Sequence, residues 1–148
     1  MHKSVQKYKD IINTIDKKLE EQKVNYTPKV IAVSKTFQLE KILPLIEYGH
    51  LDYGENKVQE AIDKWSAFKL QKQNIKLHLI GRLQTNKVKQ AIKIFDYIHS
   101  LDSIKLAKKI AVEQHKQKKN LRLFIQVNIG NENQKSGIKV GQIKDLIT

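Results

Sequence analysis

Lys35 is the first candidate for chemistry in this chain, because it ends a short apolar run, VIAVSKT, over residues 30–36. Side chains alternate along a strand, so Lys35 shares a face with Ile31 and Val33, and both faces of the run are mostly apolar. The pattern predicts a parallel strand covered on both sides that delivers an amine into a site. Desolvation there would favour the neutral amine, which forms Schiff bases with aldehydes. The competing interpretation is a strand-end lysine that extends to water.

Polar and small residues also follow the other apolar runs. In parallel α/β folds such residues lie at the carboxyl edge of the sheet, where ligands bind. An amine, amides and hydroxyls on one rim suit a polar, planar ligand, although glycine, asparagine and serine collect in ordinary turns as well. The rim residues expected from the sequence are Lys35, Thr36, Gly54, Glu55, Asn56, Gly81, Gln84, Thr85, Asn86, Ser100, Asp102, Asn128 and Gly130.

Other site motifs are missing from the sequence. It contains no cysteine, which excludes disulfides, thiolate metal sites and cysteine nucleophiles. The histidines lack local metal-ligand spacing, and there is no HExxH, P-loop, G-x-G-x-x-G or GxSxG string. We therefore expect no metal site, no dinucleotide site and no serine hydrolase chemistry. His78 and His99 are interpreted as hydrogen-bonded core histidines.

The charge of the chain is strongly basic, with a formal net charge of +13 and a pI of about 9.8. The excess is almost entirely lysine, with 26 lysines and only two arginines, Arg82 and Arg122. Arginine is the residue that grips phosphate bidentately, and the lysines are scattered rather than gathered into a stripe. We expect a solvated lysine-rich surface and no specific nucleic-acid partner. The charged start and the lack of a long apolar stretch predict a cytoplasmic protein with no membrane segment.

Five apolar runs alternate with amphipathic segments at intervals of twenty to thirty residues, which is typical of a parallel α/β architecture. Five strands are too few to close a (β/α)8 barrel, so the pattern fits either an open doubly wound sheet or an incomplete barrel. We expect one domain over 1–148. Helices are expected over the first twenty-odd residues, through 39–46, from 55, from 88, after an N-cap at Asp102 or Ser103, and from about 139. The predicted strands are 30–34, 50–53, 77–80, 97–101 and 121–129.

Five motifs in order, AVSKT, YGENKVQEA, HLIGRLQTNK, HSLD and VNIGNENQKSGI, make the chain similar to the pyridoxal phosphate homeostasis proteins over residues 31–138. That family resembles the barrel domain of alanine racemase without its second domain. The resemblance implies an α/β fold that is a partial (β/α)8 TIM barrel. It also implies that Lys35 is the Schiff-base lysine for pyridoxal 5'-phosphate and that Asn56 lines the cofactor pocket, with no catalytic residue and no metal.

The function implied by the resemblance is intracellular homeostasis of the cofactor, as a carrier or buffer that delivers it, with apo forms of pyridoxal phosphate enzymes as partners. We expect a binding protein without robust turnover. The alternative is a racemase-like pyridoxal phosphate enzyme acting on amino acids, which would require a second acid or base. Lys135 in NQKSG is a weak candidate for that role, and its competing interpretation is a solvated loop charge.

The chain departs from the family pattern at its end. Members continue through a serine-glycine-methionine-serine segment and an arginine-isoleucine-glycine segment that hold the phosphate, and the resemblance therefore implies that truncation weakens cofactor binding. A barrel interrupted after the fifth strand would also leave the 30–34 and 121–129 edges unpaired, so we expect self-association through open strand edges.

Overall fold

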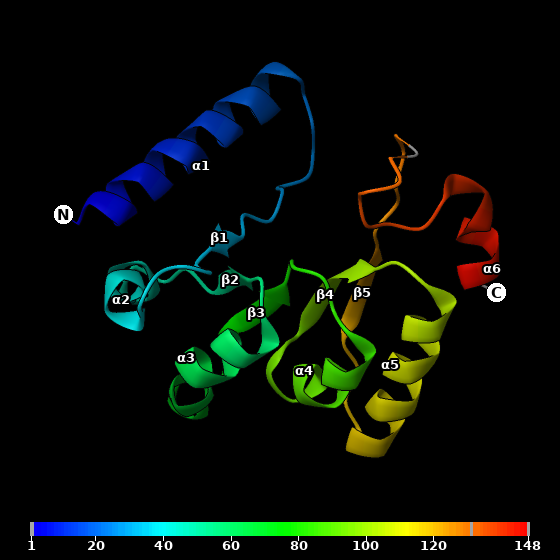
Figure 1. The fold of residues 1–148 in the computed structure, drawn as a ribbon. Coiled ribbons are helices and arrows are strands. Elements are labelled where there is room, and N and C mark those ends of the chain that lie inside the picture. Colours follow the sequence, from blue (N-terminus) through cyan, green and yellow to red (C-terminus); the bar gives the residue numbers. More distant parts are fainter. Residues whose placement is uncertain (1, 131, 148) are drawn as a thin grey trace.

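The computed structural model describes residues 2–130 and 132–147 and contains one five-stranded parallel sheet in the order β1-β2-β3-β4-β5 (Figure 1). Every neighbouring pair is parallel, because a helix carries the chain back between consecutive strands. This confirms the predicted partial (β/α) barrel of about five strands. The strands are β1 (Ala32–Val33), β2 (Asp52–Glu55), β3 (Lys76–Leu79), β4 (Tyr97–Leu101) and β5 (Arg122–Ile125).

Most helices begin close to the expected positions; the exceptions are the helices expected from 55 and from about 139, which begin at Val58 and Ile143. Ser103 is the N-cap of α5, as one of the two predicted caps, and its Oγ accepts a hydrogen bond from the Leu106 backbone N–H at 3.3 Å. Gly49, with φ +107°, follows the C-cap of α2, where a left-handed residue commonly ends a helix. The helices are α1 (Lys3–Glu21), α2 (Leu39–Glu47), α3 (Val58–Gln71), α4 (Val88–Ile94), α5 (Ile104–Gln117) and α6 (Ile143–Ile147), with 3-10 turns at Thr85–Lys87 and Val140–Gln142.

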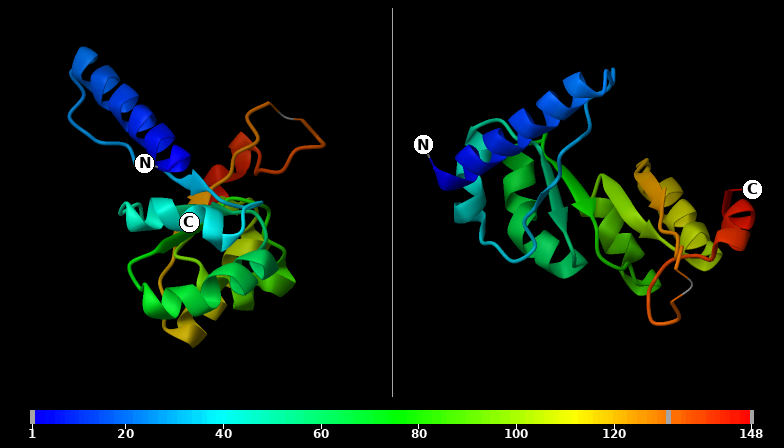
Figure 2. Two further views of the ribbon diagram at one scale, coloured as in Figure 1. Left: turned by 90° about the vertical axis from the view of Figure 1, so that its left-hand side faces the viewer. Right: turned by 90° about the horizontal axis from the view of Figure 1, so that it is seen from above.

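The two faces of the sheet have different surroundings. Helices α2 to α5 lie along one side, which we call the outer face, while α1 rises on the other side (Figure 1). Two further views show that the sheet is curved and open (Figure 2). The hydrophobic core fills the space between the outer face and these helices. Its fully buried members include Tyr53, Trp65, Leu77, Leu79, Val88, Ile92, Ile98 and Ile110.

The opposite side, the inner face, is covered far less by the described residues. Parallel register partners point to the same face, and the pairs Val33 with Gly54 and Gly54 with His78 identify inner-face positions. Val33 is 49% exposed and Phe124 is 50% exposed. The expectation that the Lys35 strand is covered on both sides is therefore wrong, because the inner side of this edge strand is open.

Strand boundaries differ from the predicted ones at β1, β2 and β5. The first strand has two residues instead of five, since it is an edge strand that pairs with β2 alone. β2 begins at Asp52 rather than at His50, whose ring nitrogen Nε2 hydrogen-bonds the Asp52 carbonyl at 2.8 Å in a turn before the strand. β5 ends at Ile125 rather than at 129, and beyond it only an isolated bridge joins Val127 to Ile138.

Because β2 extends to residue 55, the helix that follows it also differs from the prediction. Glu55 is the last residue of the strand, and α3 begins at Val58 rather than at Glu55. β3 begins and ends one residue before its predicted range, whereas β4 coincides with it. Within residues 2–130 and 132–147, no helix is long and apolar enough to cross a membrane.

Candidate functional site

Lys35 lies at the carboxyl edge of the sheet, in the turn that joins β1 to α2. Its side chain is exposed, so the desolvation expected from the sequence is not provided by the described residues. Lys35 nevertheless lines a groove of about 720 Å³ between this turn and α3, together with Thr36, Leu39 and Lys64. The volume is within the range of small-molecule sites. The position therefore supports binding at the edge that the sequence predicts.

The Lys35 amine has no partner among the residues that the structure describes. Nine ion pairs are present in that part of the chain, and none involves Lys35. Its neighbour in the groove, Lys64, is by contrast held by an ion pair with Glu55. The Lys64 Nζ also donates to the Ser34 carbonyl at 2.7 Å, so that amine is engaged at two acceptors. Lys35 is thus the better placed of these two lysines for attack on an aldehyde.

Asn56 occupies the matching position on the neighbouring strand. Lys35 and Asn56 each stand two residues beyond the register pair Val33 and Gly54, so both belong to the same edge. Asn56 is half-buried and does not line the Lys35 groove. The structure therefore brings the two predicted site residues to adjacent strand ends without joining them in one cavity, and the role of Asn56 stays a prediction.

Gly81 lets the loops after β2 and β3 approach each other closely. A Cβ atom on Gly81 would lie 2.1 Å from the backbone oxygen of Asn56 and 2.8 Å from its carbonyl carbon. Gly54 is also tightly surrounded, since a Cβ there would lie 3.2 Å from the Ile31 side chain and 3.3 Å from that of Ile80. Backbone proximity therefore requires glycine at position 81 of the IGRL motif, whereas the crowding at Gly54 of the YGEN motif comes from side chains.

Glu55 and Ser100 are not rim residues, contrary to the sequence expectation. The Glu55 side chain is fully buried on the outer face, where it contacts α3 through Lys64 and Trp65. Ser100 is buried within β4, and its Oγ has no hydrogen-bond partner. Both errors follow from strand geometry, because alternate residues of a strand point to opposite faces and these two point to the helices.

The loop beyond β5 is held by its own side chains. Asn128 Nδ2 donates to the Glu132 carbonyl at 2.9 Å, and the Glu132 backbone N–H donates to Asn128 Oδ1 at 3.3 Å. Lys135 forms an ion pair with Glu132 at 2.7 Å and is largely exposed. Lys135 thus matches the interpretation as a solvated loop charge, and nothing in its contacts favours an acid or base role.

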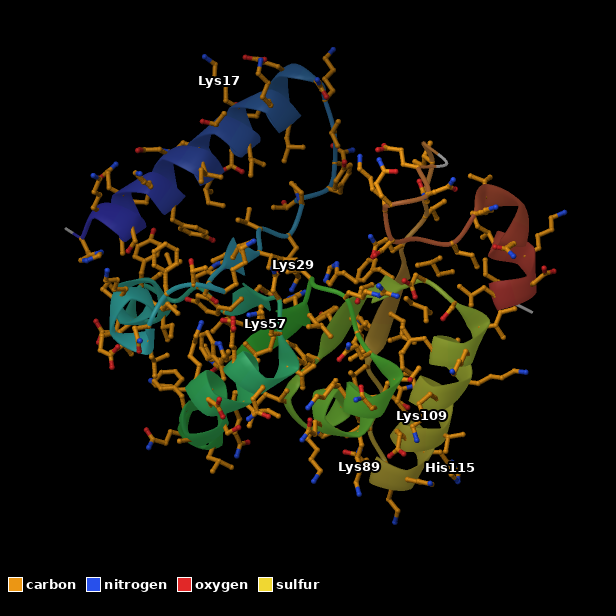
Figure 3. The ribbon with its side chains drawn as sticks, viewed as in Figure 1. Lys17, Lys29, Lys57, Lys89, Lys109 and His115 are labelled. Carbon is orange, nitrogen blue, oxygen red and sulfur yellow. The ribbon has the colours of Figure 1, made fainter. Side chains whose placement is uncertain are left out.

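A row of polar side chains crosses the inner face, from the first residue of β2 to the middle of β4. Asp52 Oδ1 lies 2.9 Å from His78 Nε2, and His78 Nδ1 lies 3.0 Å from His99 Nε2. Lys29, labelled in Figure 3 in front of the sheet, donates to Asp52 at 3.1 Å. If both rings are neutral, His78 donates to the carboxylate and accepts from His99. Both histidines are hydrogen-bonded as predicted, although His99 is only half-buried.

Stacked rings extend this row. His78 stacks on Tyr97 with centroids 4.1 Å apart, and His99 stacks on Phe124 at 4.5 Å. Burial lowers the pKa of His78, and the Asp52 carboxylate opposes that effect only in part. Burial, together with nearby His78, also lowers the pKa of His99. For Asp52, burial raises the pKa, but hydrogen bonds from His78 and Lys29 outweigh it and the net pKa is lowered. The row is therefore built for neutral histidines beside an ionised carboxylate.

Sequence reasoning misses the buried group behind Lys35, which joins Ser34, Glu55, Lys64 and Trp65. The sequence contains one indication of this group: in DYGE, Tyr53 and Glu55 point to the same face of the sheet if the strand continues to residue 55. The predicted strand ends at residue 53, so this indication is lost.

Comparisons with known proteins agree with this geometry. Curated proteins named pyridoxal phosphate homeostasis protein are 37% identical over 140 residues in Haemophilus influenzae and 40% identical over 120 residues in Buchnera aphidicola. The alignments cover 91% and 80% of this chain but only 59% and 51% of those proteins. The chain thus spans between half and three fifths of their length.

Solved structures show the same fold. PipY of Synechococcus elongatus, in a structure with PLP bound, has a TM-score of 0.74 at 30% identity, covering 90% of this chain and 62% of PipY. A protein of unknown function from Bifidobacterium adolescentis has a TM-score of 0.82 at 26% identity, covering 93% and 59%. Alanine racemase of Clostridium difficile, at 15% identity, 83% and 33% coverage and a TM-score of 0.62, shares the fold.

The family follows from the match over most of the chain. Residues 12–148 match the family described as alanine racemase, N-terminal domain, which includes all five strands and the Lys35 turn. Parallel strands, a lysine at the end of the first strand and a sheet shared with alanine racemase all agree with that match. This chain belongs to the alanine racemase N-terminal domain family.

Proposed function

We propose that this chain binds pyridoxal 5'-phosphate on Lys35 and acts in intracellular homeostasis of that cofactor, as a carrier or buffer. The observation that carries the proposal is the unpaired amine of Lys35, a residue that lines a groove at the carboxyl end of the first strand. Relatives named for pyridoxal phosphate homeostasis, and a PipY structure with PLP bound at 30% identity, support it.

The amine and the amide at this edge fit the aldehyde and ring of the cofactor. A Schiff base forms when the Lys35 Nζ attacks the aldehyde carbon and one water leaves, and the exposed position of Lys35 lets the aldehyde reach it. Gly81 allows the loops after β2 and β3 to approach each other, because a Cβ there would lie 2.1 Å from the Asn56 carbonyl oxygen. Asn56 on the adjacent strand end supplies an amide that could hydrogen-bond a polar ring substituent. When bound, the cofactor supplies an electrophilic aldehyde, and the chain supplies the amine and the surrounding shape.

The partners and the compartment belong to the same proposal. A carrier in the cytoplasm would release the cofactor to apo forms of pyridoxal phosphate enzymes, and exchange of the Schiff base with another lysine amine achieves this without a further reactant. The exposed inner side chains at β1 and β5, the two edge strands of the sheet, favour self-association as a second type of contact.

Reductive trapping tests the proposal directly. The purified chain is mixed with pyridoxal 5'-phosphate, reduced with borohydride and mapped by peptide mass. Lys35 should carry the label ahead of the 25 other lysines, and Lys35→Ala should lose this specific label while still folding. Lys89→Ala, a change of an exposed lysine on α4, is the matched control (Figure 3). Labelling spread evenly over the surface lysines would show that Lys35 is not the anchor.

A further inference from the structure

We infer that Glu55 is a positioning residue for Lys35: its buried carboxylate, acting through Ser34 and Lys64, fixes the end of the strand that carries the reactive amine. The inference rests on the proposed function in so far as Lys35 is the cofactor lysine. Glu55 itself does not line the Lys35 groove, so its effect must pass through the groups that it holds.

The strand before Lys35 needs such support. β1 consists of Ala32 and Val33 only, and it pairs with β2 alone at one edge of the sheet. Val33 is half exposed, so burial contributes little to holding it. A two-residue edge strand with one open face is prone to fray, and fraying there would move the Lys35 turn.

Ser34, immediately before Lys35, is held at all three of its polar atoms. Its backbone N–H donates to the Gly54 carbonyl at 2.9 Å, and its Oγ donates to Glu55 Oε1 at 2.7 Å. Its carbonyl accepts the Phe37 backbone N–H at 3.0 Å and the Lys64 ammonium at 2.7 Å. The residue before Lys35 is therefore held in place through its N–H, its hydroxyl and its carbonyl group.

Glu55 connects these contacts. Its Oε1 accepts hydrogen bonds from Ser34 Oγ at 2.7 Å, from Lys64 Nζ at 2.8 Å and from Trp65 Nε1 at 2.9 Å. One oxygen thus joins the end of β1 and the end of β2 to α3. Charge-assisted hydrogen bonds of this kind are the strong ones, and three that meet at one atom define its position closely.

The fold alone gives no reason for a carboxylate at this place. Glu55 is 0% exposed, and its second oxygen, Oε2, has no hydrogen-bond partner. A buried ion pair is often no more stabilising than apolar side chains of the same volume, and an unpartnered buried oxygen adds a further cost. Buried polar groups that do not stabilise the fold are found mainly at functional sites. The nearest candidate functional group here is the amine of Lys35, one residue beyond Ser34.

The experiment compares two lysines that each pair with a buried glutamate. Lys64→Met removes the ammonium that joins Glu55 to the Ser34 carbonyl. Lys109→Met removes the partner of Glu113, a 7% exposed side chain on α5 that lies 3.1 Å from Lys109, which Figure 3 labels. Amide hydrogen exchange of the cofactor-free chain reports Ser34 and Phe37, whose N–H groups are both hydrogen-bonded. Peptide mapping after borohydride trapping reports the rate at which Lys35 takes the label.

Lys64→Met should speed exchange at Ser34 and Phe37 by at least about tenfold, which corresponds to about 1.4 kcal/mol of local opening, and should slow Lys35 labelling. Lys64→Arg, which keeps the charge and the donors, should restore both readouts. Lys109→Met should leave the exchange rates and the rate of Lys35 labelling unchanged, apart from any change that follows from a lower melting temperature. If Lys64→Met does not fold, Ser34→Ala replaces it, because it removes one donor to Glu55 and little volume.

Equal effects of Lys64→Met and Lys109→Met, in proportion to their loss of stability, would overturn the inference and leave Glu55 with a structural role only. Exchange at Ser34 and Phe37 is measured without cofactor, so the clamp is tested even if the wild-type chain fails to label Lys35. That failure would contradict the proposed function, and not the positioning of the turn.

Discussion

The two faces of the sheet differ in how they are made. The outer face is covered by helices, and Leu77, Leu79 and Ile98 are fully buried there. The inner face carries the Asp52, His78 and His99 row and leaves Val33 and Phe124 half exposed. We therefore expect the stability of the fold to depend mainly on the outer side, while the groups available for chemistry lie on the inner side and at the carboxyl edge.

The largest effect is expected from the outer core. Leu79→Ala removes a fully buried side chain and should lower the free energy of unfolding by about 2–5 kcal/mol. Phe124→Ala on the inner face removes a half-exposed ring stacked on His99 and should cost about 0.5–1.5 kcal/mol. Urea unfolding measures both. Equal losses would mean that the inner face supports the fold as much as the outer one.

The carboxyl edge should respond next. Gly81→Ala places a Cβ against the Asn56 backbone and should cost about 1–3 kcal/mol while weakening cofactor retention, because the loops after β2 and β3 must separate. Gly141→Ala is the matched control, since a Cβ there has no neighbour within 4 Å. Equal melting temperatures and equal cofactor retention in the two alanine variants would show that Gly81 is not needed at this edge.

Acid should weaken the inner row. The folded pKa values of His78 and His99 are lowered, so their contribution to stability is present above about pH 6.5 and is lost as the pH falls below it. Two protonated rings would also repel each other, with Lys29 and Arg122 adding positive charge near Tyr97. The urea midpoint should therefore be lower at about pH 5 than at about pH 7.5.

Two histidine variants sharpen this acid test. His99→Phe keeps a ring against Phe124 but cannot take a proton, so its midpoint should fall less on acidification. His115→Gln changes an exposed histidine on α5 and should behave like the wild type (Figure 3). If the urea midpoint of His99→Phe falls as much as that of the wild type, a group other than His99 causes the loss of stability in acid. His50, whose pKa is also lowered by burial, would then be the next candidate.

The smallest effect concerns association through the open inner face. Replacing Val33 and Phe124 together by lysine should reduce self-association in sedimentation velocity, because it adds charge to exposed apolar positions on or beside the two edge strands. Tyr26→Lys, at a 68% exposed position in the loop before β1, should leave association unchanged. Association that survives the double change would show that other surfaces mediate it.

Much of the fold is predictable because apolar periodicity is a local property. The run at residues 97–101 and the N-cap at Ser103 are found where the pattern predicts them. The pattern misplaces the strand at residues 52–55, because Gly54 and Glu55 are poor strand residues. Gly54 is surrounded there by the side chains of Ile31 and Ile80. Glu55 is held by hydrogen bonds from Lys64 and Trp65. Local preference cannot reveal such contacts.

The candidate site is only partly predictable. Lys35 is identified by its place in a motif and at the end of a strand, and the structure places it at a groove. Its surroundings depend on pairings thirty residues apart, such as the one between Ser34 and Lys64, which no pattern within one segment contains. The exposure of Lys35 likewise depends on what lies across the inner face, and not on the residues of its own strand.

Retention of the cofactor by the wild-type chain and by Lys35→Ala tests whether Lys35 is the covalent anchor. Both proteins are saturated with pyridoxal 5'-phosphate and dialysed, and their absorbance spectra are compared with those of the cofactor-free chains. We expect a coloured wild-type protein with the band of a Schiff base and a colourless, folded Lys35→Ala variant. Equal colour in both proteins, or none in the wild type, would contradict the assignment of Lys35 as the covalent anchor.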